Sequence, residues 1–263
     1  MNATVLRALL LSSECRAVDP GLSRTYRAVA QLAGRQPIAR KVRIRASPLQ
    51  IVELAAVVIA LLGASGTIGS AYLKRAIADG HEVRVLTRDA SRVRASPGVT
   101  LIVGDARDRE AVARALAGCD VVVSAIGPRT NTPDAVPLLE ATAANVIASM
   151  RAAAVSRVIF VAGAGLALPG ERRTFGQRVV SAMVRRLAKW VVASKEREMT
   201  LYLASGLDWT ALRPPRVVAG PPGGRVQLTN DRPRALRVTS GDVAAAIAAV
   251  IADPTTIQKA PYV

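Results

Sequence analysis

The segment 55–62 reads Ala-Ala-Val-Val-Ile-Ala-Leu-Leu and runs directly into Gly63-Ala-Ser-Gly66-Thr-Ile-Gly69. A continuous apolar run is typical of a parallel strand that is covered on both faces. A helical pattern follows the glycines and ends at Asp79-Gly80, where Gly80 suits the position just beyond a helix. The strand, the glycine-rich turn and the helix together predict a dinucleotide-binding unit.

Each glycine of this turn has a physical reason in such a unit. Gly63 permits the tight turn, Gly66 lets backbone N–H groups approach a pyrophosphate, and Gly69 allows close packing of helix on strand. The helix N-terminus supplies N–H donors and a positive dipole to phosphates, and two hydroxyl side chains can add contacts. An ordinary turn that binds no ligand is the alternative. The predicted phosphate-binding residues are Gly63, Ser65, Gly66, Thr67, Ile68 and Gly69.

Strand and helix patterns alternate along the rest of the chain. Apolar runs predict strands over 82–87, 99–103, 120–126, 157–162 and 208–212, and helical spacing predicts helices over 108–117, 133–153, 174–203 and 241–251. This alternation predicts an α/β fold of the Rossmann type, a doubly wound parallel sheet with a small C-terminal elaboration on the substrate side. We expect a single NAD(P)-binding domain over 51–263.

The end of the second predicted strand indicates which dinucleotide is bound. An NAD-preferring site places an acidic residue about 20 residues after the glycines, where it binds the ribose 2′-hydroxyl. Here that position holds Arg88, whose planar, permanently charged guanidinium matches a 2′-phosphate. Asp89 follows one residue later and leaves NAD(H) as the alternative. We therefore predict NADP(H) as the preferred cofactor.

Two further strand ends offer cofactor contacts. Asp105 follows the third strand, where its carboxylate can accept from an adenine amino group, with a helix-capping turn as the alternative. The fourth strand ends in Ser124-Ala125-Ile126-Gly127, where Ala125, Ile126 and Gly127 leave room for the nicotinamide ribose. Beyond the nicotinamide, we expect segments 162–166 and 214–218 to line the acceptor cavity.

Composition excludes several other function classes. The chain has 263 residues, 36 Lys and Arg against 19 Asp and Glu, and a net charge of +17. Two cysteines and one histidine provide neither a disulfide framework nor a Cys- or His-based metal site, so we predict no metal. The apolar run that ends at Leu62 falls short of the roughly 20 residues that span a bilayer. We expect a cytoplasmic protein that makes no membrane contact.

The positive charge is unevenly distributed. Residues 1–50 hold nine cationic and two acidic side chains and show no sustained periodicity. We interpret them as a basic, poorly ordered extension, with a docking arm or a targeting segment as alternatives. Arginine pairs such as Arg185-Arg186 suggest nucleic-acid binding as a further function, through contacts with phosphates. Few aromatic residues lie nearby for base stacking, however. We expect a solvated arginine-rich surface and no nucleic-acid partner.

Six blocks in order resemble a known family. They are similar to blocks of the atypical short-chain dehydrogenases of the NmrA-like, NAD(P)H-binding group: Gly63–Gly69, Leu86-Thr-Arg-Asp89, Gly104-Asp105, Ser124–Gly127, Lys195-Glu196 followed by Ser205–Pro214, and Ser240-Gly-Asp-Val-Ala244. The resemblance covers about residues 54–263. It implies the Rossmann fold, a nicotinamide dinucleotide, and relatives that include flavin and biliverdin-IXβ reductases as well as regulators.

The sequence identifies no catalytic residue. Classical short-chain dehydrogenases, unlike the atypical group that this sequence resembles, use Tyr-x-x-x-Lys, in which the lysine lowers the pKa of the tyrosine acid. Lys195 occupies the lysine position, but Val191 stands where the tyrosine would be, and segment 161–165 has no hydroxyl. We predict that Lys195 binds the nicotinamide ribose or an acidic substrate, with a solvated helix lysine as the equal alternative. His81 is predicted to be an ordinary loop histidine.

Two functions fit this pattern. Hydride transfer to a flavin or quinone can take its proton from solvent, so it needs orientation more than a protein acid. The first function is therefore an NADP(H)-dependent oxidoreductase with a small acceptor. The alternative is a non-catalytic NAD(P)-binding redox sensor or regulator of the NmrA type.

Overall fold

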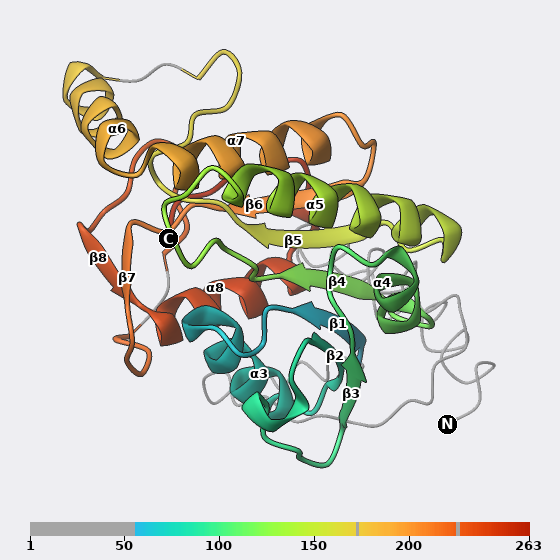
Figure 1. Cartoon of the computed structure of the whole chain (residues 1–263). Coiled ribbons are helices and arrows are strands. Elements are labelled where there is room, and N and C mark those ends of the chain that lie inside the picture. Colours follow the sequence, from blue (N-terminus) through green and yellow to red (C-terminus); the bar gives the residue numbers. More distant parts are fainter. Residues whose placement is uncertain (1–55, 172–173, 225–226) are drawn as a thin grey trace, which may run out of the picture. The chain divides into compact units, whose positions relative to one another are not determined.

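The computed structural model describes residues 56–171, 174–224 and 227–263 (Figure 1). The predicted extension 1–50 lies outside these residues. The described helices and strands are, in chain order, β1 (Val58–Leu62), α3 (Thr67–Ala78), β2 (Glu82–Thr87), η2 (Ala90–Arg92), β3 (Val99–Val103), α4 (Arg109–Leu116), β4 (Val121–Ser124), α5 (Ala135–Ala152), β5 (Arg157–Val161), α6 (Phe175–Leu187), α7 (Lys189–Leu203), β6 (Asp208–Leu212), β7 (Arg216–Val218), β8 (Arg237–Thr239), α8 (Ser240–Ala252) and η3 (Pro254–Thr256).

Six strands form one sheet in the order β3-β2-β1-β4-β5-β6, and all neighbouring pairs are parallel. Leu62 at the end of β1 is level with Leu86 of β2 and Ser124 of β4, so the carboxyl ends of these strands meet at one edge. The winding reverses between β1 and β4, which makes this edge the switch point where open α/β sheets bind ligands. The predicted doubly wound fold is confirmed.

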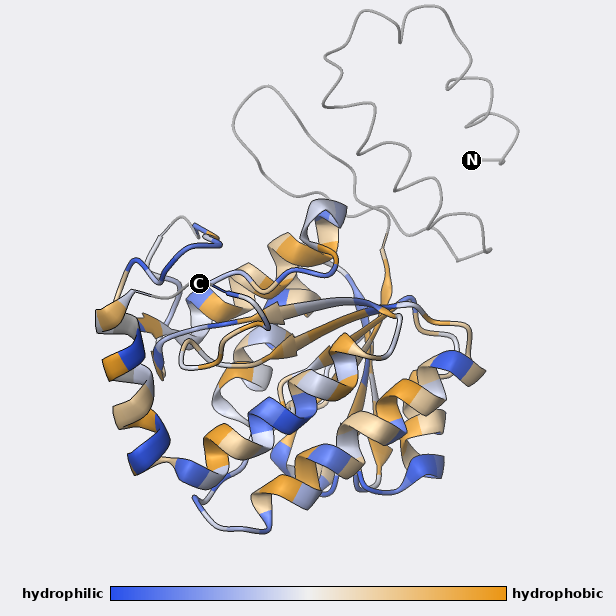
Figure 2. Ribbon diagram, turned by 90° about the horizontal axis from the view of Figure 1, so that it is seen from above, coloured by the Kyte–Doolittle hydropathy of each residue, from blue (hydrophilic) through white to orange (hydrophobic). Residues whose placement is uncertain are grey.

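Helices cover both faces of the sheet (Figures 1 and 2). Along β1, Ile59 and Leu61 enter one hydrophobic cluster and Ala60 and Leu62 enter the other, because successive strand side chains alternate. Helices α3 and α8 complete the first cluster, and α4, α5 and α7 complete the second. A sheet buried on both faces explains why its central strands read as continuous apolar runs.

The predicted single helix over 174–203 is wrong, because two helices occupy this segment. The break falls at Ala188, whose ψ of 46° departs from helical geometry. Asn131 holds both helix ends: its amide nitrogen donates to the Leu187 carbonyl at 3.0 Å, and its oxygen accepts from the backbone N–H groups of Trp190 and Val191. One long-range side chain therefore ends α6 and starts α7, and the local periodicity did not reveal it.

The C-terminal elaboration is a parallel pair, β7 with β8, followed by α8. Thr239 and Asp242 form a capping box at the start of α8, with reciprocal side-chain to backbone bonds of 3.0 and 2.9 Å. The bounds of β2, β3 and β6 match the predicted ranges. Within the described parts of the chain, no helix combines the length and apolar character needed to cross a membrane.

Candidate dinucleotide site

The glycine-rich turn lies between β1 and α3, at the switch point of the sheet. Gly63 has a φ of +86°, in the region that favours glycine, and a Cβ there would lie 2.7 Å from the carbonyl carbon of Ala125. A Cβ on Gly69 would lie 2.1 Å from the carbonyl oxygen of Gly63. Helix α3 therefore packs directly on the turn, and both positions require glycine.

The amino end of α3 presents backbone donors without a side-chain cap. Gly66 is the N-cap residue, and the first turn of the helix contains no acidic side chain. Gly66 and Thr67 are exposed, while Ser65 and Ile68 are half-buried. N–H groups at the positive end of a helix dipole bind phosphate. The turn therefore fits the pyrophosphate of a dinucleotide.

Arg88 directly follows β2, the strand next to β1. Its side chain is exposed, and it lies close enough to Asp105 for its positive charge to help lower the pKa of that carboxyl group. Among the described residues, no carboxylate forms an ion pair with Arg88. The exposed guanidinium fits an incoming phosphate group, as its sequence position suggests.

Asp89, the nearest acidic alternative, takes part in a local turn. Its Oδ1 accepts hydrogen bonds from the backbone N–H of Ser91 at 2.9 Å and from the Ser91 hydroxyl at 2.6 Å, and this caps η2. These hydrogen bonds hold the pKa of Asp89 below its ordinary value. One oxygen of Asp89 is thus committed to the turn, which weakens the case for NAD selection through this residue.

Asp105 also forms a local turn. Its Oδ1 accepts from the backbone N–H of Arg107 at 2.9 Å, and both of its carboxylate oxygens accept from the Arg107 guanidinium at 3.1 and 2.9 Å. The Arg107 bonds hold the pKa of Asp105 below its usual range. The residue that caps α4 is Asp108, and Asp105 forms a turn three residues before it, so Asp105 does not itself cap the helix. An adenine contact from Asp105 stays a prediction.

The end of β4 lies beside the glycine-rich turn. The backbone N–H of Ala125 donates to the carbonyl of Leu62 at 2.9 Å, which extends the pairing of the two strands beyond their ends. Ala125 and Ile126 are half-buried, and a Cβ added at Gly127 would have no heavy atom within 4 Å among the residues beyond its chain neighbours. The small residues leave room at the position predicted for the nicotinamide ribose.

Lys195 connects the ends of β4 and β5 from inside the protein. Its Nζ donates to the backbone carbonyls of Ile126 and Val161, both at 2.7 Å, and to Oε2 of Glu198 at 2.8 Å. The Lys195 side chain is only 9% exposed, so the alternative of a solvated helix lysine is wrong. All three ammonium protons have acceptors, so Lys195 fixes the backbone around the predicted nicotinamide position. Its contact with the ribose stays a prediction.

The sequence reading missed the partners of Lys195. Glu198 is fully buried, and burial raises its pKa against the opposing effect of Lys195. Tyr202, one turn further on α7, stacks on Phe160 with ring centroids 4.4 Å apart. Within the described residues, Glu198 Oε1 and the Tyr202 hydroxyl have no hydrogen-bond partner. The spacing of Lys195, Glu198 and Tyr202 on one helix face was the available signal.

The two segments predicted to line the acceptor cavity, 162–166 and 214–218, contact each other. The backbone N–H of Ala164 donates to the carbonyl of Pro214 at 2.9 Å, so segments 162–166 and 214–218 lie side by side. Segment 162–166 has no hydroxyl side chain, and Tyr202 is completely buried.

His81 lies before β2, at the opposite edge of the sheet, where it accepts from the backbone N–H of Val57 at 3.5 Å. In the described residues, no group of three His, Cys, Asp or Glu side chains suits a metal ion.

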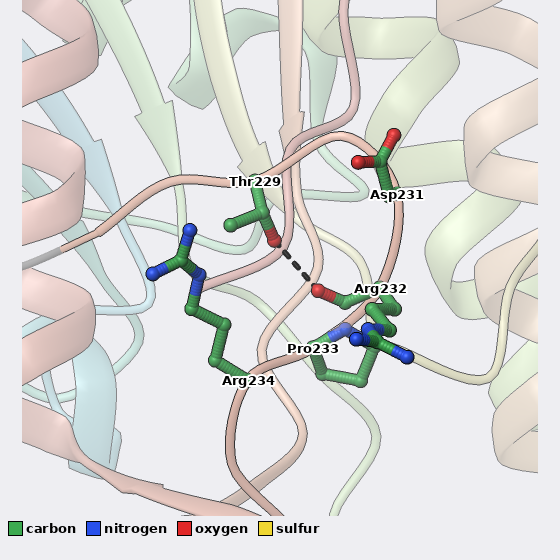
Figure 3. A pocket seen from close by; sticks show the side chains of 5 residues that line it. All are labelled: Thr229, Asp231, Arg232, Pro233 and Arg234. Atoms are coloured by element: carbon green, nitrogen blue, oxygen red, sulfur yellow. Dashed lines mark hydrogen bonds between the residues drawn. The ribbon is translucent and has the colours of Figure 1, made fainter.

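A surface hollow of about 650 Å³ lies in the connection between β7 and β8 (Figure 3). Its lining residues are exposed or half-buried, and the Thr229 hydroxyl donates to the Arg232 carbonyl at 2.6 Å across it. Most of its lining residues are polar or charged and none belongs to the glycine-rich turn, so we do not place the dinucleotide there. It is lined by Thr229, Asp231, Arg232, Pro233 and Arg234.

The switch point, the glycine-rich turn and the uncapped start of α3 are the features of a dinucleotide-binding protein with the Rossmann fold. Residues 63–254 match the model of the NAD(P)H-binding family, and the chain belongs to that family. The predicted membership of an NAD(P)H-binding family is thereby confirmed.

Solved structures agree with this assignment. A Burkholderia pseudomallei protein is 30% identical over 78% of this chain and 98% of its own, with a TM-score of 0.62. An anaerobilin reductase from Escherichia coli O157:H7 is 24% identical over 78% of this chain and 95% of its own, with a TM-score of 0.65. A Veillonella parvula short-chain dehydrogenase/reductase in complex with NADP is 19% identical over 78% and 93%, with a TM-score of 0.64. At these identities the last two show the shared fold.

Proposed function

We propose that the protein is an NADP(H)-dependent reductase that passes hydride to a small acceptor such as a flavin or quinone. The observation that carries the cofactor choice is the exposed Arg88 guanidinium at the end of β2, beside an Asp89 that caps η2. Its charge and planar donor set match a ribose 2′-phosphate. The NADP bound in the Veillonella structure supports this choice for a protein of the same fold.

The residues around the predicted nicotinamide position orient groups and leave proton transfer to solvent. The bound cofactor would supply the hydride. Lys195 holds the carbonyls of Ile126 and Val161 in place, and this fixes the backbone that borders the nicotinamide. Because a reduced flavin or quinone can take its proton from water, the lack of a hydroxyl in segment 162–166 does not prevent turnover. The reductase among the structural neighbours supports this reading.

The cofactor assignment is tested by Arg88→Ala. Loss of a charged contact to the 2′-phosphate costs about 1.5–3 kcal/mol, so we expect roughly 10- to 100-fold weaker NADPH binding, measured by fluorescence titration. NADH binding should change only a few-fold. Arg114→Ala, an exposed arginine on α4, is the matched control and should alter neither affinity. Equal losses for NADPH and NADH would overturn the assignment.

A redox sensor of the NmrA type is the second candidate function. It is favoured by the state of Lys195, whose three protons are already donated within the protein, so that none is presented to a substrate. Stopped-flow oxidation of NADPH with FMN, FAD and quinones separates the two functions. Turnover with one acceptor supports the reductase, and tight binding without oxidation of any acceptor supports the sensor. For both functions we propose a cytoplasmic location, where nicotinamide dinucleotides are available.

A further inference from the structure

Helix α6 exposes a continuous row of large apolar side chains. Phe175, Val179, Met183 and Leu187 are 83%, 52%, 56% and 72% exposed. They follow one another at intervals of four residues, so they form one stripe along the helix. Isolated exposed apolar residues are ordinary, whereas a contiguous patch marks an interaction surface.

The opposite side of α6 holds the helix against the protein. Val184 is half-buried and packs on the hydrophobic cluster that α4, α5 and α7 share, and its Cγ1 lies 3.6 Å from the position of a Cβ on Gly165. Figures 1 and 2 both show α6 at the rim of the domain, beyond the start of α7. The helix is therefore fixed by one side while the apolar stripe faces outward.

The charges around the stripe are positive. Helix α6 contains no acidic residue, and its arginines are Arg178, Arg185 and Arg186. At 3.6 residues per turn, Arg178 and Arg185 lie along one edge of the stripe and Arg186 lies within it. Arg185 forms an ion pair with Glu196 at 2.7 Å, but no acidic side chain in the described residues pairs with Arg178 or Arg186. Two exposed cations thus accompany the apolar row.

We propose that α6 binds the surface of anionic phospholipid bilayers. Phe175, Val179, Met183 and Leu187 would enter the boundary between headgroups and acyl chains, while Arg178 and Arg186 extend to the lipid phosphates. A basic amphipathic helix with large apolar side chains on one face is the form that lies in a membrane interface. Arginine suits this position because its aliphatic stem covers apolar surface while its charge stays in the headgroup layer.

Charge favours an anionic bilayer over two other partners for the stripe, a second copy of α6 and residues 1–50 of the same chain. A second copy of α6 would set Arg178 and Arg186 against the same arginines, with no acidic residue on either helix to neutralise them. Residues 1–50, with nine cations and two acids, carry the same sign of charge. An anionic bilayer supplies both the apolar layer and the negative charge. The expectation of no membrane contact rested on the lack of a spanning segment, which does not bear on a surface helix.

Vesicle sedimentation of the full chain tests the proposal. The protein is mixed with vesicles of phosphatidylcholine alone and with vesicles of equal parts phosphatidylcholine and phosphatidylglycerol. We expect binding to the anionic vesicles only. The triple variant Phe175→Ser, Met183→Ser and Leu187→Ser keeps the net charge and should weaken binding by more than about tenfold, because three buried side chains lose their apolar contact with lipid.

Two matched controls separate the stripe from general surface properties. Val103→Ser with Leu236→Ser removes exposed apolar residues elsewhere and should leave binding unchanged. Arg178→Gln with Arg186→Gln should weaken binding more than Arg109→Gln with Arg114→Gln, which changes the net charge equally on the exposed surface of α4. Equal effects of the two arginine pairs would show binding through diffuse charge and would overturn the proposal.

Self-association is followed in the same samples by sedimentation velocity. A wild-type dimer that becomes a monomer in the triple serine variant, without vesicle binding by either, would assign the stripe to a second copy and overturn the proposal. Thermal unfolding checks that the variants fold, and Met183→Ser alone replaces the triple variant if the latter unfolds early. None of these measurements depends on cofactor binding or turnover.

Discussion

The two halves of the sheet bury different kinds of side chain. In the glycine-turn half (β1–β3 with α3 and α4), Asp79 and Thr87 are the buried polar residues, and all described cations reach the surface. In the acceptor half (β4–β6 with α5–α8), Arg157, Lys195 and Arg213 are all buried. In the first half the predicted phosphate-binding groups are backbone N–H groups and surface side chains, and most of the buried side chains are apolar.

The buried cations of the acceptor half hold backbone segments together. Arg157 donates to the carbonyls of Asp208 and Val250 at 2.8 and 2.7 Å. Arg213 donates to the carbonyl of Ala260 at 2.6 Å and pairs with Glu171 at 2.7 Å. Lys195 and Arg213 act at the carboxyl ends of the strands, on the acceptor side, whereas Arg157, the first residue of β5, ties the amino ends of β5 and β6 to α8. The two halves therefore hold their backbone in place differently. The glycine-turn half relies on glycine geometry, and the acceptor half relies on buried charged side chains.

The largest effect is expected from Lys195→Met. The substitution leaves Glu198 and two strand-end carbonyls buried without their cation, and breaking a buried pair in this way costs about 3–5 kcal/mol. The free energy of unfolding from urea titrations measures the loss. Lys189→Met, on the exposed start of the same helix, is the control and should cost less than about 1 kcal/mol.

Glu198 supplies two sharper tests of the same pair. Adding Glu198→Leu to Lys195→Met removes the uncompensated carboxylate and should restore much of the lost stability. The loss from Lys195→Met alone should also shrink as the pH falls, because burial already raises the pKa of Glu198 and protonation removes its buried charge. If Lys195→Met proved as harmless as Lys189→Met, buried charge would not hold the acceptor half together.

The difference between the glycine-turn half and the acceptor half also explains which features could be predicted from the sequence. The glycines of the turn from Gly63 to Gly69 lie close together in the chain, and the place of the turn between strand and helix was readable from spacing alone. The fold followed from apolar runs, because a sheet covered on both faces needs them. Arg88 was found by counting from the glycines.

The acceptor half depends on contacts between distant residues. Lys195 bonds to Ile126, 69 positions away, and Arg157 bonds to Val250, 93 positions away. Asn131 divides the predicted helix 174–203 from outside it. No local pattern encodes such pairs, so the sequence reading placed Lys195 on its helix but not in its buried network.

A medium effect is expected from Gly69→Ala in the glycine-turn half. The added Cβ would lie 2.1 Å from the Gly63 carbonyl oxygen, so α3 must move away from the turn, and forced overpacking costs about 1–3 kcal/mol. Gly176→Ala in the first turn of α6 is the control, since nothing lies within 4 Å of the added Cβ there, and it should not destabilise the protein. Urea unfolding of both variants measures the contrast. A Gly69→Ala protein as stable as the wild type would show that the turn does not require close packing.

The smallest effect concerns His81, the single histidine of the chain, in the glycine-turn half. Burial lowers its pKa below 6.5, with Asp79 opposing and Arg75 adding to the shift. The folded state therefore binds fewer protons than the unfolded state, so the contribution of His81 to stability is complete above pH 6.5 and declines as the pH falls below it. The measurement is the free energy of unfolding as a function of pH, for the wild type and for His81→Gln. The difference between the two curves isolates this decline, because the buried Glu198 titrates in both proteins. A flat difference below pH 6.5 would mean that His81 has the same pKa in the folded and unfolded states, and would contradict the prediction.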